Sequence, residues 1–461
     1  MPEQLLWASR AWIRGGWRDA VLLAVDQSGR WSAITEGVST PPADARRLGG
    51  PLLPGMVNAH GHAFQRAFAG LSERRDSHAD DFWSWRDRMY QVALRITPQQ
   101  MQAVAAQLYV ELLRGGYTQV CEFHYLHHDQ SGQRYPDPAT MCWALADAAQ
   151  EAGLGMTLLP VLYERAGFAQ PALRTDQRRF ASTPALVHGF CRDALAAQRP
   201  LLNAGVAIHS LRAASLESMQ QLLHLVGAAA VPIHLHIAEQ TQEVDDCLLA
   251  HGAHPIAWLC DHLPLDARWQ LVHATHATDA EIEAVARSAA GIVICPSTEG
   301  NLGDGLTNLP GWLQHAVPMA IGSDSHVTRN WPEELRWLEY GQRLLRRQRN
   351  VAAAPATQPA SAARLFDAAL SAGAAAAGQG CWGLVSGARA DALVLDATAP
   401  ALLGIPPSHQ LDALVFAGAE SAFAEVMVAG NVVMRHGQHL QQQTIAARYT
   451  SVMQELWSAA A

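Results

Sequence analysis

The chain has 461 residues and is 49% hydrophobic, which is enough for one large buried core with a small accessory unit. Acidic residues outnumber arginine and lysine by 42 to 33; this charge and the lack of long basic runs argue against nucleic-acid binding. Every basic residue is arginine or histidine, so a Schiff-base lysine, a P-loop lysine and a carbamylated lysine bridging two metal ions are all excluded.

Cysteine usage and hydropathy point to the cytoplasm. The 7 cysteines are scattered without a CxxC pair, which is typical of reduced thiols rather than of a disulfide framework. The first residues lack the apolar core of a signal peptide, and no window of the sequence approaches a membrane span. We therefore expect a soluble cytoplasmic protein that does not bind membranes.

Both ends of the chain have the pattern of short strands separated by turns. This pattern fills residues 1–53 and returns at 390–397 and 424–438, while 444–460 has a helical period. Each β-rich end is too small to form a domain alone. We predict that 1–53 and 384–438 together form a β-sandwich accessory domain, followed by a C-terminal helix within 439–461.

The long middle of the chain alternates between apolar strand-like runs and helical segments. Strand-like runs include 116–123, 155–163, 205–210, 231–239, 269–275, 291–298 and 317–325, with helical segments such as 98–116 and 279–291 between them. This alternation predicts an α/β fold, a (β/α)₈ TIM barrel over 54–383. A doubly wound open sheet is the competing architecture, but the first strand is not followed by a GxGxxG turn.

Active sites of such barrels lie at the carboxyl ends of the strands, and four strand ends carry metal-binding or acid–base side chains. These are His60 and His62, His234 and His236 with Glu239 beyond them, His273, and Asp324. Each has an ordinary structural explanation, because the chain has 21 histidines and an aspartate often caps a helix. The four strand ends in barrel order together predict one metal site at the mouth.

This set of residues resembles the amidohydrolase superfamily, with HxH on strand one, histidines on strands five and six, and aspartate on strand eight. The resemblance covers essentially the whole chain and implies that His60, His62, His236 and Asp324 are metal ligands. We choose His236 over His234 because Glu239 then follows three residues later, as in the HxxE of the deaminase-type branch, which leaves His234 packed in the barrel.

The resemblance also implies a cofactor and catalytic roles. Without a lysine to bridge two ions, three imidazoles and one carboxylate suit one divalent ion, with Zn²⁺ expected and Fe²⁺ or Mn²⁺ also compatible with the ligand set. Such an ion lowers the pKa of water to about 7. His273 and Asp324 are expected to orient the water and take its proton, and Glu239 is expected to protonate the departing nitrogen.

Longer segments resemble one family within this superfamily, the formimidoylglutamate deiminases of histidine degradation. They are PGMVNAHGHAFQRAFAG (54–70), DDFWSWRDRMYQ (80–91), CEFHYLHH (121–128), HSLRA (209–213), HIAEQ (236–240) and CPSTEGNLGDG (295–305). This resemblance implies hydrolysis of N-formimidoyl-L-glutamate to N-formyl-L-glutamate and ammonia.

A dicarboxylate substrate requires cationic side chains beside the acid–base groups. Guanidinium groups suit carboxylates, so we expect Arg212, after strand four, and Arg86, in a loop after strand one, to bind the substrate. Gln65, Tyr125 and His209 match further substrate-contacting positions of the family. His124, His127 and His128 are interpreted as loop histidines.

Two alternatives to this function stay open from the sequence. One is another deaminase of the superfamily that acts on a purine or pterin such as guanine, for which two arginines would have no carboxylates to bind. The other is a barrel kept as a non-catalytic binding or assembly module, which the complete ligand set disfavours. Relatives of this kind are commonly homodimers, so we expect a homodimer here.

Overall fold

The computed structural model describes residues 4–73, 82–418 and 421–458. At its centre, parallel strands form a barrel in the order β14–β13–β12–β11–β10–β8–β7–β6, with β9 (Leu202–Ala204) added beside β8. The barrel strands are β6 (Met56–Gly61), β7 (Tyr117–His124), β8 (Gly155–Leu162), β10 (Val206–Ile208), β11 (Ile233–Ile237), β12 (Trp269–His273), β13 (Gly291–Ile294) and β14 (Met319–Ile321). The predicted TIM barrel is confirmed, and the open doubly wound sheet is excluded.

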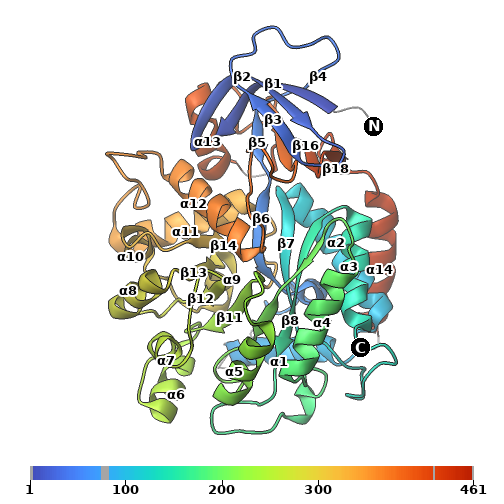
Figure 1. Cartoon of the computed structure of the whole chain (residues 1–461), viewed down its shortest axis with the longest axis vertical. Coiled ribbons are helices and arrows are strands. Elements are labelled where there is room, and N and C mark those ends of the chain that lie inside the picture. The colour runs from blue at the N-terminus through green and yellow to red at the C-terminus, as the bar shows by residue number, and fades with distance from the viewer. Residues whose placement is uncertain (1–3, 74–81, 419–420, 459–461) are drawn as a thin grey trace.

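The barrel strands are covered on both faces, as parallel sheets require. Every residue of β7 and β8 is buried, because one face fills the barrel and the other contacts the surrounding helices (Figure 1). The helices are α1 (Phe82–Ala93), α2 (Pro98–Arg114), α3 (Thr140–Ala152), α4 (Pro184–Ala196), α5 (Leu216–Val226), α6 (Thr241–His251), α7 (Pro255–His262), α8 (Asp279–Ser288), α9 (Pro296–Leu302), α10 (Leu309–Gln314), α11 (Trp331–Arg346), α12 (Ser361–Ala376), α13 (Gln410–Phe416) and α14 (Gln442–Ser458).

Local signals in the sequence set where helices begin. Thr97 precedes α2 with an extended backbone, and its side chain accepts a hydrogen bond from the backbone N–H of Gln100, while the side-chain oxygen of Gln100 accepts one from the backbone N–H of Thr97. Thr278 and Glu281 form the same reciprocal cap at the start of α8. Each cap satisfies two backbone donors that have no partner inside the helix.

The barrel closes where its last strand meets its first. Gly61 and Asp324 form a parallel bridge, and the backbone N–H groups of Ser323 and Asp324 donate to the carbonyl of His60 at 3.1 and 3.0 Å. This approach needs a residue without a side chain at Gly322, where an added Cβ would lie 2.7 Å from Cβ of His60. The seam therefore brings the end of β14 against the end of β6.

The flanking segments combine into one accessory sheet. Its order is β18–β17–β16–β15–β5–β1–β2–β3, with β4 beside β1, and it encloses a hydrophobic core of its own. Figure 1 shows this sheet at one end of the molecule, from which β5 leads directly into the start of β6. Its strands are β1 (Gln4–Ile13), β2 (Gly16–Val25), β3 (Trp31–Thr35), β4 (Arg46–Arg47), β5 (Leu52–Pro54), β15 (Ala392–Leu395), β16 (Phe423–Val428), β17 (Asn431–Arg435) and β18 (Gln438–His439).

Two helices of the C-terminal part lie against the barrel. Helix α14 occupies the segment with the predicted helical period and packs on α2, and Arg66 donates a hydrogen bond of 2.8 Å to the hydroxyl of Tyr449. Helix α13 interrupts the β-rich C-terminal segment and packs on α11 and α12. Within the described ranges, no helix has both the length and the apolar character needed to cross a bilayer.

Candidate active site and metal centre

The predicted metal ligands meet at the barrel seam. Nε2 of His60 lies 3.1 Å from Nε2 of His62 and 2.9 Å from Nε2 of His236. Oδ1 of Asp324 lies 3.5 Å from Nε2 of His60 and 3.3 Å from Nε2 of His62. Two ligands about 2.1 Å from one tetrahedral ion lie about 3.4 Å apart, so these separations match a shared cation.

The protonation of these imidazoles also fits a cation. Nδ1 of His62 lies 2.8 Å from the carbonyl oxygen of Phe123, which can only accept, so Nδ1 carries the hydrogen and Nε2 keeps its lone pair. Burial lowers the pKa of His60 to about 3 and that of His236 well below its ordinary value. Among three neutral imidazoles whose Nε2 atoms crowd together, hydrogen bonds cannot satisfy every Nε2 atom at once, whereas a divalent ion accepts the lone pairs of all three.

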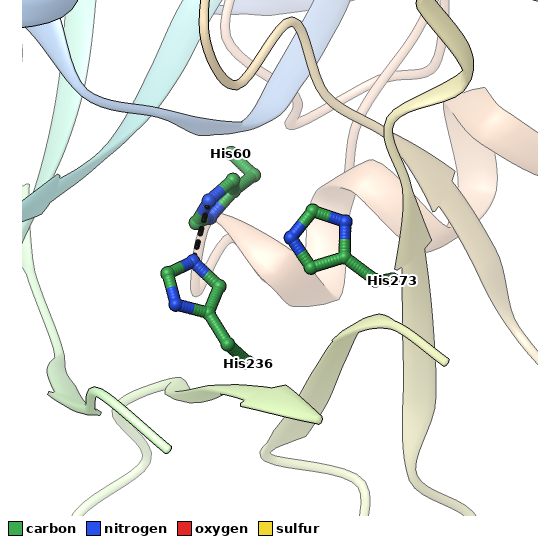
Figure 2. Close-up of side chains that lie close together, drawn as sticks. All are labelled: His60, His236 and His273. Carbon is green, nitrogen blue, oxygen red and sulfur yellow. Dashed lines mark hydrogen bonds between the residues drawn. The ribbon is translucent and has the colours of Figure 1, made fainter. Parts of the chain in front are cut away.

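His273 and Glu239 lie beside these ligands. The rings of His60, His236 and His273 turn toward a common point (Figure 2), and Nε2 of His273 lies 3.6 Å from Oε1 of Glu239. The same nitrogen lies 3.9 Å from Oδ2 of Asp324. Asp324 thus presents one oxygen to the histidine ligands and the other to His273.

Charge around His273 outweighs its burial. Burial opposes a positive charge, but attraction by Glu239, a hydrogen bond with Glu299 and attraction by Asp324 raise the pKa of His273 to about 10. Burial raises the pKa of Glu239, and the nearby carboxylate of Asp324 acts in the same direction. A cation held by the neighbouring ligands would oppose this positive charge and free Nε2 of His273 to accept a proton, as proton transfer requires.

The backbone is strained at the strand ends that carry these residues. His273 has φ of 71°, Asp324 has φ of 44°, and Ala238, next to Glu239, has φ of 51°. Non-glycine residues rarely adopt this left-handed conformation, and such residues concentrate at functional sites.

One pocket joins the predicted acid–base residues to the predicted substrate contacts. Its lining includes ten of the predicted site residues: His62, His236, Asp324, His273, Glu239, Gln65, Arg86, Tyr125, His209 and Arg212. His60, behind them, completes the predicted set. The structure therefore brings together all of the predicted metal-binding, catalytic and substrate-binding residues.

The two arginines reach the pocket from different elements. Arg212 follows β10, and its Nη2 lies 3.9 Å from Oε2 of Glu243. Burial opposes the charge of Arg212, yet Glu243 and Glu239 raise its pKa above the ordinary value. Arg86 was expected in a loop, but it lies on helix α1.

The polar contacts of the pocket are arranged around Tyr125. Nε2 of Gln65 donates to the Tyr125 hydroxyl at 3.3 Å, while Oε1 of Gln65 has no hydrogen-bond partner among the residues described. The ring of His209 is 5.6 Å from that of Tyr125 and 5.1 Å from that of His236. Gln65 thus presents a buried acceptor next to the predicted metal ligands.

Other histidines have structural partners. Nε2 of His234 lies 2.9 Å from the carbonyl oxygen of Ala376, at the end of α12, and burial lowers the pKa of His234 to about 4. Nε2 of His127 lies 2.9 Å from the carbonyl oxygen of Val161. His124 ends β7, while His127 and His128 lie in the loop after it; all three are buried. In the described parts of the chain, none of these histidines belongs to a group of side chains spaced for a metal ion.

Sequence reasoning missed several residues of this region. Tyr90 and Tyr163 line the pocket, and Nε2 of Gln177 donates to their hydroxyls at 3.2 and 3.0 Å. Tyr163 directly follows β8, so the strand-end rule that selected His273 also applied to it. Gln177 lies in the long connection after β8, where no sequence pattern marked it. Glu299 contacts His273 from helix α9 and was also missed.

Comparison with known families and proteins gives a consistent result. The model of the Amidohydrolase family matches residues 52–433. A formimidoylglutamate deiminase of Pseudomonas aeruginosa is 43% identical over 452 residues, covering 98% of this chain and 99% of that protein. A 5-methylthioadenosine/S-adenosylhomocysteine deaminase of Desulfovibrio desulfuricans is 28% identical over 390 residues, covering 84% of this chain and 80% of that protein.

Solved structures agree with this result. An amidohydrolase from Brucella melitensis has a TM-score of 0.93 and 39% identity, covering 98% of this chain and 99% of that one. An adenosine deaminase from Xanthomonas campestris with bound zinc shares the fold, with a TM-score of 0.80 and 22% identity over 99% of this chain and 98% of that one.

Proposed function

Because the chain belongs to the amidohydrolase family, whose members are metal-dependent, and is a hydrolase of C–N bonds, we propose that it deaminates N-formimidoyl-L-glutamate. The products are N-formyl-L-glutamate and ammonia, a reaction of histidine degradation. The observation that carries this proposal is the pocket in which Arg86 and Arg212 stand with His273, Glu239 and Asp324. The similarity to a formimidoylglutamate deiminase along nearly the whole chain supports the same substrate.

In this proposal His60, His62, His236 and Asp324 would hold one divalent ion, Zn²⁺. Such an ion would supply Lewis-acid chemistry, because a bound cation lowers the pKa of water to about 7. The crowded Nε2 atoms support this assignment, and the absence of lysine from the chain supports a single ion.

The remaining groups move protons and hold the reacting carbon in place. Nε2 of His273 and Oδ2 of Asp324 accept the proton of the attacking water, consistent with their separation of 3.9 Å. Glu239, 3.6 Å from the same nitrogen, delivers one proton to the substrate nitrogen and takes one back from the hydroxyl group added to the carbon. The proton taken from the water passes to the same substrate nitrogen, so that neutral ammonia leaves when the C–N bond breaks.

The same pocket supplies contacts for the rest of the substrate. Arg212 and Arg86 pair with its two carboxylates, because a guanidinium group offers two parallel donors that match a carboxylate. Gln65, Tyr125 and His209 add hydrogen bonds within the pocket. We further propose that the protein acts in the cytoplasm as a homodimer, which the molar mass in solution tests.

Ammonia release tests the substrate directly. We expect the purified protein to release ammonia from N-formimidoyl-L-glutamate and to lose this activity when a chelator is present. Guanine, adenosine, 5-methylthioadenosine and a pterin form the comparison panel, since relatives at lower identity are deaminases of an adenosine derivative. A higher kcat/KM on any of these than on N-formimidoyl-L-glutamate would favour the alternative deaminase.

Substitution of Arg212 tests the carboxylate contact. We expect Arg212→Ala to raise KM for N-formimidoyl-L-glutamate by about 10- to 100-fold, because charge-assisted hydrogen bonds contribute about 1.5–3 kcal/mol each. Arg192, an exposed arginine of α4, provides the control, and Arg192→Ala is expected to leave KM unchanged. An unchanged kcat/KM in Arg212→Ala would remove Arg212 from the binding site.

A further inference from the structure

Glu299 lies against His273 on the side away from the two pocket carboxylates. It belongs to helix α9, which follows β13, and its side chain is buried. Oε1 of Glu299 lies 3.3 Å from Nδ1 of His273 and accepts a hydrogen bond of 2.9 Å from the backbone N–H of Cys295. The backbone N–H of Cys295 therefore holds this carboxylate oxygen in place.

The contact determines which nitrogen of His273 carries a hydrogen. A carboxylate oxygen accepts, so Nδ1 of His273 donates to Glu299, and in the neutral ring Nε2 is then the nitrogen with the lone pair. Nε2 is the atom that faces Glu239 at 3.6 Å and Asp324 at 3.9 Å. Without an acceptor at Nδ1, the other tautomer and a flipped ring become accessible, and both remove the lone pair from the pocket.

The backbone of His273 does not by itself hold the ring in this orientation. Its φ of 71° is a strained conformation that persists only where surrounding contacts enforce it. Glu299 supplies such a contact from a different strand–helix unit of the barrel. The hydrogen bond therefore joins the ends of β12 and β13 at the pocket.

A second metal ion is the other explanation for these side chains. Ligand atoms of His273, Cys295 and Glu299 all lie within 4.8 Å of one another. The separation of Nδ1 and Oε1 is that of a hydrogen bond, however, and Oε1 already accepts from the Cys295 backbone. Burial raises the pKa of the Cys295 thiol well above its ordinary value, so the sulfur remains a poor ligand.

We propose that Glu299 is a positioning residue for the reaction: it holds the Nε2 lone pair of His273 toward Glu239 and Asp324. This inference rests on the proposed deaminase function, in which His273 accepts the proton of water. Glu299 itself does not contact the substrate pocket, and it is not among the residues that line it.

The chain offers a matched control for a purely structural role. Glu334 is also fully buried, and its carboxylate accepts hydrogen bonds from the backbone N–H of Ser297 at 2.9 Å and from the Ser297 hydroxyl at 2.7 Å. Both glutamates thus hold the start of helix α9, but Glu299 alone of the two contacts His273. A difference between their variants isolates that contact.

Glu299→Gln, Glu299→Met and Glu334→Gln are compared for kcat, KM, thermal unfolding and metal content. We expect Glu299→Gln to lower kcat by about 10- to 100-fold while KM stays within about threefold, the loss typical for a group that orients an active-site histidine. Glu299→Met, which lacks any acceptor, is expected to lower kcat further. Glu334→Gln is expected to lower the unfolding temperature with kcat within about threefold of the unsubstituted protein.

Rates are expressed per folded, metal-containing chain, so loss of fold or of metal does not mimic the effect. A kcat within about threefold in Glu299→Gln, or an equal fall in Glu334→Gln, overturns the positioning role. If the unsubstituted protein does not hydrolyse N-formimidoyl-L-glutamate, the proposed function fails instead. The same variants are then compared on whichever substrate of the panel it deaminates, which tests Glu299 separately.

Discussion

Replacing His273 with alanine is expected to lower kcat by about 10³-fold, or about 4 kcal/mol in the activation barrier. The imidazole is the group between the two carboxylates of the pocket, 3.6 Å from Glu239 and 3.9 Å from Asp324. Without the imidazole, no base remains between the carboxylates of Glu239 and Asp324. Asp324→Ala is expected to be at least as severe, because it removes a metal ligand and a proton acceptor together. Ammonia release under saturating substrate measures both.

His276 provides the control for His273. It lies three residues further along the chain, is half-buried, and does not line the pocket. His276→Ala is expected to keep kcat within about threefold. If His273→Ala retained more than about a tenth of the activity with its metal still bound, His273 would not be the proton acceptor.

The second large effect is expected at the metal ligands. His236→Ala should weaken metal binding by more than about 100-fold, since even the loss of a group that only orients a ligand costs about 10- to 100-fold. Metal analysis after dialysis is expected to find one equivalent in the unsubstituted protein and far less in the variant. Activity should fall in parallel and recover partly when excess Zn²⁺ is added.

His234 is the matched control, because it is buried on the same strand two residues before His236. His234→Ala loses its contact with the Ala376 carbonyl and leaves a cavity, so it should lower the free energy of unfolding by about 1–3 kcal/mol. Its metal content should stay at one equivalent. Equal metal loss in both variants would show that destabilisation, not ligation, is responsible. Unsubstituted protein that lacks metal and stays inert after metal addition would instead support a non-catalytic barrel.

The metal-binding part of the candidate site was predictable from the sequence because its residues lie at strand ends. Alternation of strands and helices predicts a closed parallel sheet, and all carboxyl ends of its strands then lie at one rim. His60 lies on β6, and His62 directly follows this strand with an extended backbone, so the two side chains point to the same side. The position of Glu239 three residues after His236 distinguished that histidine from His234, which contacts a carbonyl at the end of α12.

Parts of the fold and of the pocket were not predictable in the same way. Arg86 was expected in a loop, yet it lies on α1, because the aromatic segment before it shows no periodicity that separates a loop from a short helix. Gln177 reaches the hydroxyls of Tyr90 and Tyr163 from a long connection without regular pattern. Helix α13 lies in a segment that was expected to be β-rich, and its packing on α11 and α12 accounts for its buried face.

By itself, the sequence determined the fold class, the absence of any lysine chemistry and the residue types at each strand end, because these follow from composition and from the period of the hydrophobic pattern. Only the tertiary structure decided how those ends meet. Closure of the barrel at Gly322 sets Asp324 beside His60, with one oxygen toward the ligands and the other toward His273. Glu299 reaches His273 from the next strand–helix unit. Distances across a barrel depend on closure and side-chain packing, which no local pattern encodes.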